Sequence, residues 1–161
     1  ADEAGKSWVL QVNARERPDT LCFLLSDAST RKLFHFAPFD LAFLRFHWGV
    51  RAQNVACTKI LSRLVNPGLK AHSLKDVLDR ELGVSLPKDE AVRRSDWLVE
   101  RLSPAQLSYA VADVAHLIPL YDDLMEKATR RGVSRLAEHS FNYLPARVET
   151  ELLGLGDIFE Y

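Results

Sequence analysis

The order of the apolar patterns along the chain restricts the fold most strongly: segments with strand character come first, and helical segments follow them. Residues 7–13 (SWVLQVN) alternate between apolar and polar side chains, and residues 20–25 (TLCFLL) and 32–36 (KLFHF) are short apolar runs. Each of these segments predicts a β-strand, and residues 14–19 predict the turn between the first two. Strands that are followed by helices predict an α/β or α+β domain.

The spacing of the second and third predicted strands conflicts with a parallel arrangement. Only residues 26–31 lie between them, whereas a parallel crossover needs a dozen or more residues. Two explanations remain open. Either the two strands form a hairpin, or a helix that normally lies between them is absent from the sequence.

Four helices are predicted in the rest of the chain, over residues 39–46, 55–64, 72–82 and 103–131. The first three end at stop signals that contain glycine: Gly49, Asn66-Pro67-Gly68 and Gly83. The fourth begins with Ser103, Pro104 and Gln106, an order that predicts a capping box. Its predicted core stripe consists of Leu107, Ala110, Val111, Val114, Leu117, Ile118, Tyr121 and Leu124.

The remaining segments lack a clear period. Residues 84–94, which include Pro87, predict a polar connection between the third and fourth helices. Residues 132–161 predict a less regular tail, and their aromatic and apolar side chains indicate that this tail packs on the domain.

Size and composition indicate one globular domain without a membrane segment. The chain has 161 residues, of which 47% are hydrophobic and 27% are charged, close to the globular average. It contains no apolar run long enough to span a bilayer, and its polar residues 1–6 do not resemble a secretion signal. Cys22 and Cys57 have no CxxC spacing, which favours inert thiols in a reducing compartment. We therefore expect a cytoplasmic protein.

The net charge of −1 bears on the class of function. A protein that only coats nucleic acid is usually basic overall. A nuclease can be neutral, because its carboxylates hold metal ions that meet the phosphates. The charge therefore weakens the case for a passive nucleic-acid-binding module and is compatible with an enzyme.

Three polar residues interrupt apolar stretches. Asp40 lies in FHFAPFDLAFL at a junction between strand and helix, and Asp113 lies in YAVADVAHLIPLY. Tyr109 and Asp113 are four residues apart, so they project from the same face of a helix. A divalent cation would remove the cost of burying such a carboxylate. Taken singly, however, Asp40 also fits an N-cap, and the Tyr109–Asp113 pair also fits ordinary packing with an exposed aspartate.

Residues 32–127 resemble ribonuclease D and its relatives, the DEDD exonucleases with a tyrosine in the last motif. Five blocks appear in the family's order: FHFAPFDLAFL, CTKILSRLVNPG, HSLKDVLDRELGV, RRSDW and LSPAQLSYAVADVAHLIPLYDDL. The resemblance implies an α/β, ribonuclease H-like (DnaQ-like) fold with a central mixed sheet flanked by helices. The exonuclease domain would comprise residues 1–131, and residues 132–161 would be a C-terminal extension packed on it.

The resemblance also implies an activity. The chain would be a 3′–5′ exoribonuclease that acts on single-stranded RNA 3′ ends with two divalent metal ions, Mg²⁺ or Mn²⁺. Asp40 and Asp113 would be metal ligands, and Tyr109 would orient the attacking water, because a neutral phenol suits positioning better than proton abstraction. The sequence leaves the oligomeric state open.

One motif of the family departs from the expected pattern. The Asp-x-Glu motif, which would supply two further carboxylates, should lie well before Gln11. Asp2 and Glu3 are too close to Gln11 to fill that role. We therefore expect the motif upstream of Ala1. A chain that had lost it would instead be a non-catalytic nucleic-acid-binding or scaffold protein.

Further residues are predicted to contact the substrate: His35, Phe39, Arg94 and Trp97. Trp97 could stack on a base, although a core position suits it equally well. Asp96 more readily caps a local turn, and His35 and His72 fit packed side chains better than zinc ligands. Two explanations fit Lys59, Arg63, Lys70 and Lys75 equally well: they form a basic rim for the nucleic-acid backbone, or they lie on ordinary solvated helix faces.

Overall fold

A computed structural model of the chain describes residues 1–12, 16–86 and 89–160. Its sheet consists of two short parallel strands, β1 (Lys32–Phe34) and β2 (Val55–Cys57), in which Phe34 pairs with Cys57. Helix α2 (Ala37–Trp48) connects them, as a parallel pair requires. The carboxyl ends of both strands therefore lie at the same edge of the sheet.

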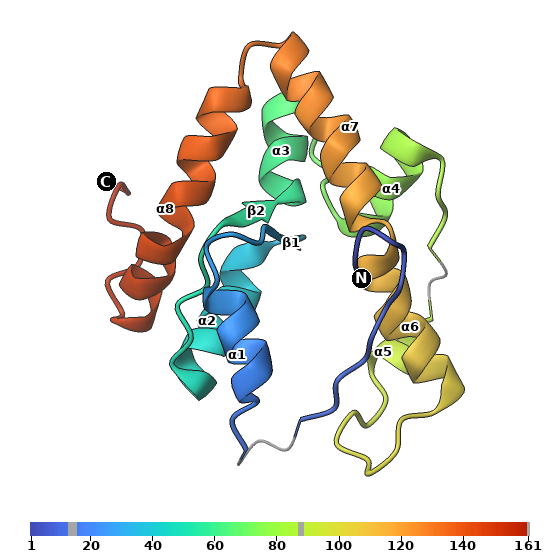
Figure 1. Cartoon of the computed structure of the whole chain (residues 1–161). Coiled ribbons are helices and arrows are strands. Elements are labelled where there is room, and N and C mark those ends of the chain that lie inside the picture. The colour runs from blue at the N-terminus through green and yellow to red at the C-terminus, as the bar shows by residue number, and fades with distance from the viewer. Residues whose placement is uncertain (13–15, 87–88, 161) are drawn as a thin grey trace.

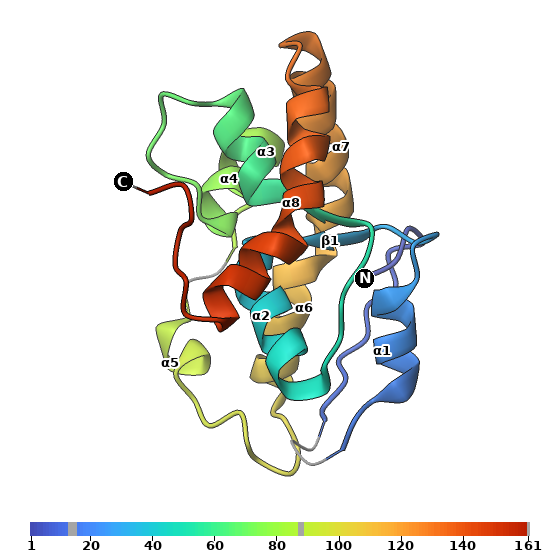
Figure 2. The ribbon, with the colours of Figure 1, turned by 90° about the vertical axis from the view of Figure 1, so that its left-hand side faces the viewer.

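The other helices surround this β1–α2–β2 unit. They are α1 (Asp19–Ser26), α3 (Thr58–Val65), α4 (Leu74–Leu82), α5 (Glu90–Arg93), α6 (Pro104–Ala115), α7 (Leu117–Arg130) and α8 (Ser134–Leu152). Figure 1 shows α7 and α8 converging at the top of the molecule with α3 between them. Figure 1 shows α2 and α6 on two sides of the lower half, and Figure 2, turned by 90°, shows them at similar heights.

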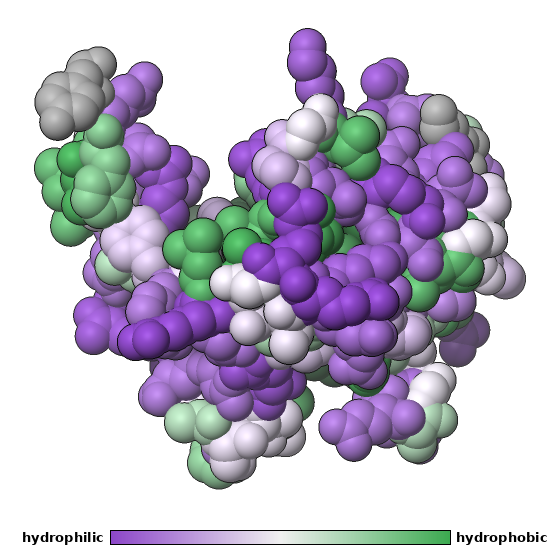
Figure 3. Space-filling model, turned by 90° about the horizontal axis from the view of Figure 1, so that it is seen from above, coloured by the Kyte–Doolittle hydropathy of each residue, from purple (hydrophilic) through white to green (hydrophobic). Residues whose placement is uncertain are grey.

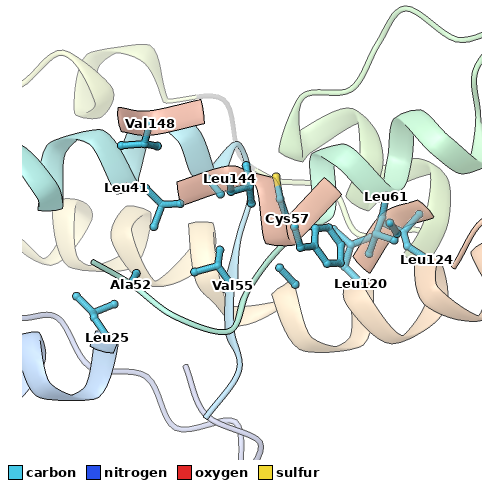
Figure 4. Packing of buried hydrophobic residues seen from close by; sticks show 14 of the residues in the cluster. Leu25, Leu41, Ala52, Val55, Cys57, Leu61, Leu120, Leu124, Leu144 and Val148 are labelled. Atoms are coloured by element: carbon cyan, nitrogen blue, oxygen red, sulfur yellow. The ribbon is translucent and has the colours of Figure 1, made fainter. Parts of the chain in front are cut away.

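The core lies where the strands meet α2, α3, α7 and α8. Helix α3 packs on α7, and α8 packs on α2 and β2. Leu61, Leu120 and Leu124 are fully buried, and Figure 4 shows them together with side chains from β2 and α8. The upper end of the molecule, by contrast, is mostly hydrophilic (Figure 3). The buried apolar residues form one contiguous cluster, and burial of apolar surface is the main favourable contribution to folding.

The strand predicted at residues 20–25 is wrong, because this segment is helix α1. Its buried residues, Cys22 and Leu25, are three positions apart, while Phe23 and Leu24 are exposed. A short apolar run does not by itself distinguish a strand from a buried helix. The correction also removes the spacing conflict, since residues 27–31 now connect a helix to β1.

The strand predicted at residues 7–13 is also wrong over its described part. Residues 7–12 form no strand, and Trp8 and Leu10 are exposed. No other strand pairs with this segment in the described ranges, and a strand needs such a partner for its backbone groups. Residue 13, residues 14 and 15 of the predicted turn, and Pro87 lie outside the described residues, and Asp19, the last residue of that turn, begins α1.

Several local predictions are confirmed. Residues 32–34 form a strand, and Gly49 and Gly83 end α2 and α4 in the left-handed conformation. Ser103 and Gln106 form the expected capping box, in which the Ser103 amide donates to the Gln106 side chain at 2.9 Å. Both cysteines are buried and free. None of the helices described is long and apolar enough to cross a membrane.

Four predictions about where helices begin, break or are absent need correction. The helix expected at residues 55–64 begins only at Thr58, because Val55–Cys57 pairs with β1 as β2. The connection predicted at residues 84–94 contains the short helix α5. The long helix predicted over residues 103–131 breaks at His116 into α6 and α7. The tail, expected to be less regular, forms helix α8, whose buried side chains join the core.

The break at His116 changes which residues of the predicted stripe are buried. In α7 the buried residues are Leu117, Leu120, Leu124 and Ala128. In α6 the only buried side chain is Gln106, and Leu107 is 40% exposed. Helix α6 therefore extends beyond the core and lies mainly against α5 and α7.

Candidate active site

Asp40 lies in the first turn of α2, just beyond the carboxyl end of β1. Pro38 occupies the start of the helix, where a missing N–H is tolerated. Partial burial raises the pKa of the Asp40 carboxyl to about 6, even though its own backbone amide lowers it. Among the described residues no cationic side chain forms an ion pair with Asp40. The fold thus keeps a partly desolvated carboxylate without a compensating charge.

Tyr109 and Asp113 project from one face of α6, one turn apart. Asp113 is exposed at the surface, yet the protein atoms beneath it raise the pKa of its carboxyl through partial desolvation. Desolvation, together with the nearby charge of Asp113, raises the pKa of the Tyr109 phenol. The phenol therefore keeps its proton at neutral pH and can still donate a hydrogen bond.

Trp97 and Arg94 lie on the segment that leads into α6. The Trp97 ring meets the Tyr109 ring edge to face, with 6.1 Å between the ring centroids, and its indole N–H donates to the Arg93 carbonyl at 3.3 Å. Arg94 is exposed and forms an ion pair with Glu90 at 3.4 Å. Trp97 therefore contacts Tyr109, Arg94 lies at the end of α5, and Asp113 lies one turn beyond Tyr109 along α6.

Gln106 positions this group, a role that the sequence did not reveal. Its side-chain amide donates to the Ser95 hydroxyl at 3.0 Å and to the Asp96 carbonyl at 2.8 Å. The buried glutamine thus holds the loop before Trp97 against α6, in addition to capping the helix. Asp96 accepts from the Leu98 amide at 2.8 Å, which confirms its turn role. The only sequence signal for this arrangement was the predicted capping role of Gln106, whose burial is seen in the structure.

His35 lies between β1 and α2, and both of its ring nitrogens have partners inside the protein. Nδ1 is 2.9 Å from the Thr58 hydroxyl, and Nε2 is 3.0 Å from the His72 carbonyl. A carbonyl only accepts, so Nε2 carries the proton and Nδ1 accepts in the neutral ring. Neither nitrogen is left for a substrate. The structure therefore favours a packing role for His35, as for His72, whose Nδ1 is 2.8 Å from the Ser62 hydroxyl.

Burial lowers the pKa of His35 to about 4, and the charges of Lys59 and His72 act in the same direction. The unfolded chain, with a histidine pKa of about 6.5, then binds a proton more readily than the folded chain. The contribution of neutral His35 to the free energy of unfolding is therefore fully present above pH 6.5, and it is lost as the pH falls towards 4.

We expect the free energy of unfolding to fall between pH 7 and pH 5 by about 2 kcal/mol more in the parental protein than in His35→Gln. Urea titrations at the two pH values, followed by tryptophan fluorescence, measure this difference. His139→Gln, which removes an exposed histidine, should keep the parental pH dependence. Equal losses in the parental protein and His35→Gln would contradict the effect of burial on His35.

The predicted site residues thus fall into two groups. Asp40 and the 69% exposed Phe39 lie at the start of α2, whereas Tyr109, Asp113, Trp97 and Arg94 lie around α6. Over the described ranges, no three or more acidic, histidine or cysteine side chains surround a common point. The candidate metal ligands Asp40 and Asp113 therefore provide two carboxylates from two separate helices.

Comparison with known proteins identifies the family. The family model for 3′–5′ exonucleases matches residues 2–129. The chain belongs to this family. Ribonuclease D of Cronobacter turicensis is 31% identical to the chain over 109 residues, which are 68% of the chain but 29% of that protein. The chain thus spans less than a third of this relative.

Two solved structures of NrnC from Brucella melitensis are similar to the chain over 94% of its length and 74% of theirs. The structure with bound Mg²⁺ is 39% identical, with a TM-score of 0.85. The structure bound to pGG is 40% identical, with a TM-score of 0.86. Together with the family match, these similarities confirm the predicted resemblance to ribonuclease D and its relatives and the ribonuclease H-like α/β fold. The described residues form two parallel strands of its sheet, β1 and β2.

Proposed function

We propose that the protein removes nucleotides from the 3′ ends of single-stranded RNA with Mg²⁺ or Mn²⁺. The observation that carries the proposal is the Asp40 carboxyl, which is partly buried, has a pKa raised to about 6 and forms no ion pair within the described ranges. A cation would compensate this carboxylate, and family membership indicates what the cation would serve. RNA is the substrate class that the name of the matched ribonuclease D supports.

The residues present fit a hard divalent cation. Mg²⁺ prefers oxygen ligands and usually takes one or two carboxylates, with water and phosphate completing its shell. Asp40 and Asp113 would supply those carboxylates in our proposal, and the similar NrnC binds Mg²⁺ in one solved structure. Two such ions would generate hydroxide near neutral pH and stabilise the departing 3′ oxygen.

The side chains around α6 would handle water and substrate. Tyr109, whose phenol stays protonated, would hold the attacking water through its hydroxyl, and the Trp97 ring would fix the orientation of the Tyr109 ring. Exposed Phe39 and Arg94 would contact a base and a phosphate of the 3′-terminal nucleotides. The complex of NrnC with pGG supports a short nucleic-acid end as ligand.

We expect 5′-labelled single-stranded RNA to be shortened stepwise in Mg²⁺ or Mn²⁺, and EDTA to abolish the shortening until excess metal is restored. Denaturing gels of time courses measure it, and the same sequence as DNA tests the preference for RNA. RNA that bound tightly but stayed intact in both metals would contradict the proposal. That result would favour a non-catalytic nucleic-acid-binding protein on the same fold.

A further inference from the structure

An exposed aromatic ring and a lysine come together at the carboxyl ends of the two parallel strands. Phe34 of β1 is paired with Cys57 of β2, and Phe36 and Lys59 each follow two residues later. The Lys59 ammonium lies 4.1 Å from the centroid of the Phe36 ring. In open α/β sheets, ligands bind beyond the carboxyl ends of the strands. The position of this pair is therefore that of a ligand-binding edge.

Phe36 has a backbone and an exposure that packing does not explain. Its φ of 74° and ψ of 47° lie in the left-handed region, which is a genuine outlier for a bulky side chain. The residue is nevertheless 49% exposed, so burial of the ring does not offset the backbone strain. Strained residues of this kind cluster at ligand-binding sites.

Lys59 carries a charge that its surroundings do not neutralise. It lies in the first turn of α3, where the positive end of the helix dipole disfavours a cation. In the part of the chain that the structure describes, its ammonium forms no salt bridge. The ammonium lies over the Phe36 ring instead. Both the lysine and the helix terminus therefore attract an anion to the same place.

We infer that Phe36 and Lys59 form a nucleotide subsite, in which a base of single-stranded nucleic acid stacks on Phe36 and its phosphate binds Lys59. The inference rests on the proposed function, because Phe36 precedes the proposed metal ligand Asp40 by one helical turn. An aromatic ring beside a cation matches the alternation of base and phosphate in a single strand. Stacking tolerates every base, so the subsite contributes affinity without sequence preference.

The affinity test uses fluorescence anisotropy of 5′-labelled single-stranded RNA, with Ca²⁺ in place of Mg²⁺ to slow hydrolysis. We expect Phe36→Leu to weaken binding between about 5-fold and about 150-fold. Phe36→Trp, which keeps an aromatic face, should retain the parental affinity. Leucine is as strained as phenylalanine at a positive φ, so the melting temperature of Phe36→Leu should match that of the parental protein.

The charge test uses the salt dependence of the same binding. Lys59→Gln should reduce the slope of log affinity against log salt by about 0.7, the value for one phosphate contact in a single strand. Lys59→Arg should keep the slope. In the hydrolysis assay, Phe36→Leu and Lys59→Gln should raise KM and leave kcat near the parental value.

Matched controls remove similar groups elsewhere. Phe46→Leu removes a 74% exposed ring farther along α2, and Arg135→Gln removes an exposed charge on α8; both should bind RNA as the parental protein does. The subsite would be overturned if Phe36→Leu kept the parental RNA affinity and Lys59→Gln kept the parental salt slope. It would also be overturned if the two variants changed only the self-association of the protein. RNA binding with a Lys59-dependent slope but no hydrolysis by the parental protein would overturn the proposed function and leave the subsite standing.

Discussion

Asp40→Asn is expected to lower metal-dependent hydrolysis by about 100-fold or more while making the metal-free protein more stable. Loss of groups that only orient a metal ligand already costs 10- to 100-fold, so loss of a ligand should cost at least as much. The gain in stability follows from the pKa of Asp40, which burial raises to about 6. Activity and stability thus change in opposite directions.

The sign of the stability change depends on pH. A folded-state pKa above the ordinary value means that the ionised carboxylate destabilises the fold at pH 7, and that this penalty disappears as the pH falls from 6 to 4. In EDTA at pH 7 the gain should be about 1–2 kcal/mol, because contact with solvent reduces the full effect of the shift. Thermal unfolding of the parental protein and of Asp40→Asn in EDTA, at pH 7 and at pH 4, measures this gain.

Asp113→Asn is the matched comparison. Asp113 is exposed, so this variant should lose hydrolysis to a similar extent without a comparable gain in stability. Added Mg²⁺ should raise the melting temperature of the parental protein and of neither variant, since a ligand stabilises the state that binds it. Parental hydrolysis in either variant, or an unchanged melting temperature of Asp40→Asn in EDTA, would contradict the role assigned to that residue.

Tyr109→Phe is expected to lower kcat by about 100-fold with metal binding retained. The substitution removes only the hydroxyl, and the ring can keep its contact with Trp97. Poor positioning of a reacting group costs about 100-fold, and this loss should appear in kcat and kcat/KM alike. Single-turnover hydrolysis at saturating metal, together with titration calorimetry of Mg²⁺, separates the two effects.

Tyr143→Phe is the control for the loss of a phenol. Tyr143 lies on α8 and contacts Phe159, so its hydroxyl should have no effect on hydrolysis. Cleavage by Tyr109→Phe at the parental rate would show that Tyr109 does not position the water. A loss of metal affinity in Tyr109→Phe would instead assign Tyr109 to the metal site.

Helix ends were predictable because they depend on local chemistry. Gly49 and Gly83 adopt the left-handed conformation that ends a helix, and Ser103 with Gln106 forms its capping box within four residues. The first strand, residues 32–34, was also predicted. The helix ends depend on few neighbours, so the sequence contains the necessary information for them.

Features that depend on distant partners were not predictable. Residues 20–25 have strand-like composition but form α1, where Cys22 and Leu25 join the common core. Val55–Cys57 becomes a strand only because β1 lies beside it. The break at His116 depends on which half of the predicted helix meets the core, and apolar periodicity continues through the break.

The sequence offered candidate site residues but not their arrangement in space. Asp40, Tyr109 and Asp113 drew attention because they interrupt apolar stretches. The hydrogen bonds from Gln106 that hold the loop before Trp97 connect residues ten and eleven positions apart. The Phe36–Lys59 contact spans 23 positions, and it became visible only once β1 and β2 were known to be parallel.

The sparse burial of α6 links the energetics of metal binding to local opening of the chain. Gln106 is its only buried side chain, and helices with few buried apolar contacts unfold locally before the core does. An ion bound by Asp113 would stabilise the docked form of this labile segment. Part of the intrinsic binding energy would be spent on ordering α6, so the measured metal affinity would report the docking of a helix as well as the strength of the ligands.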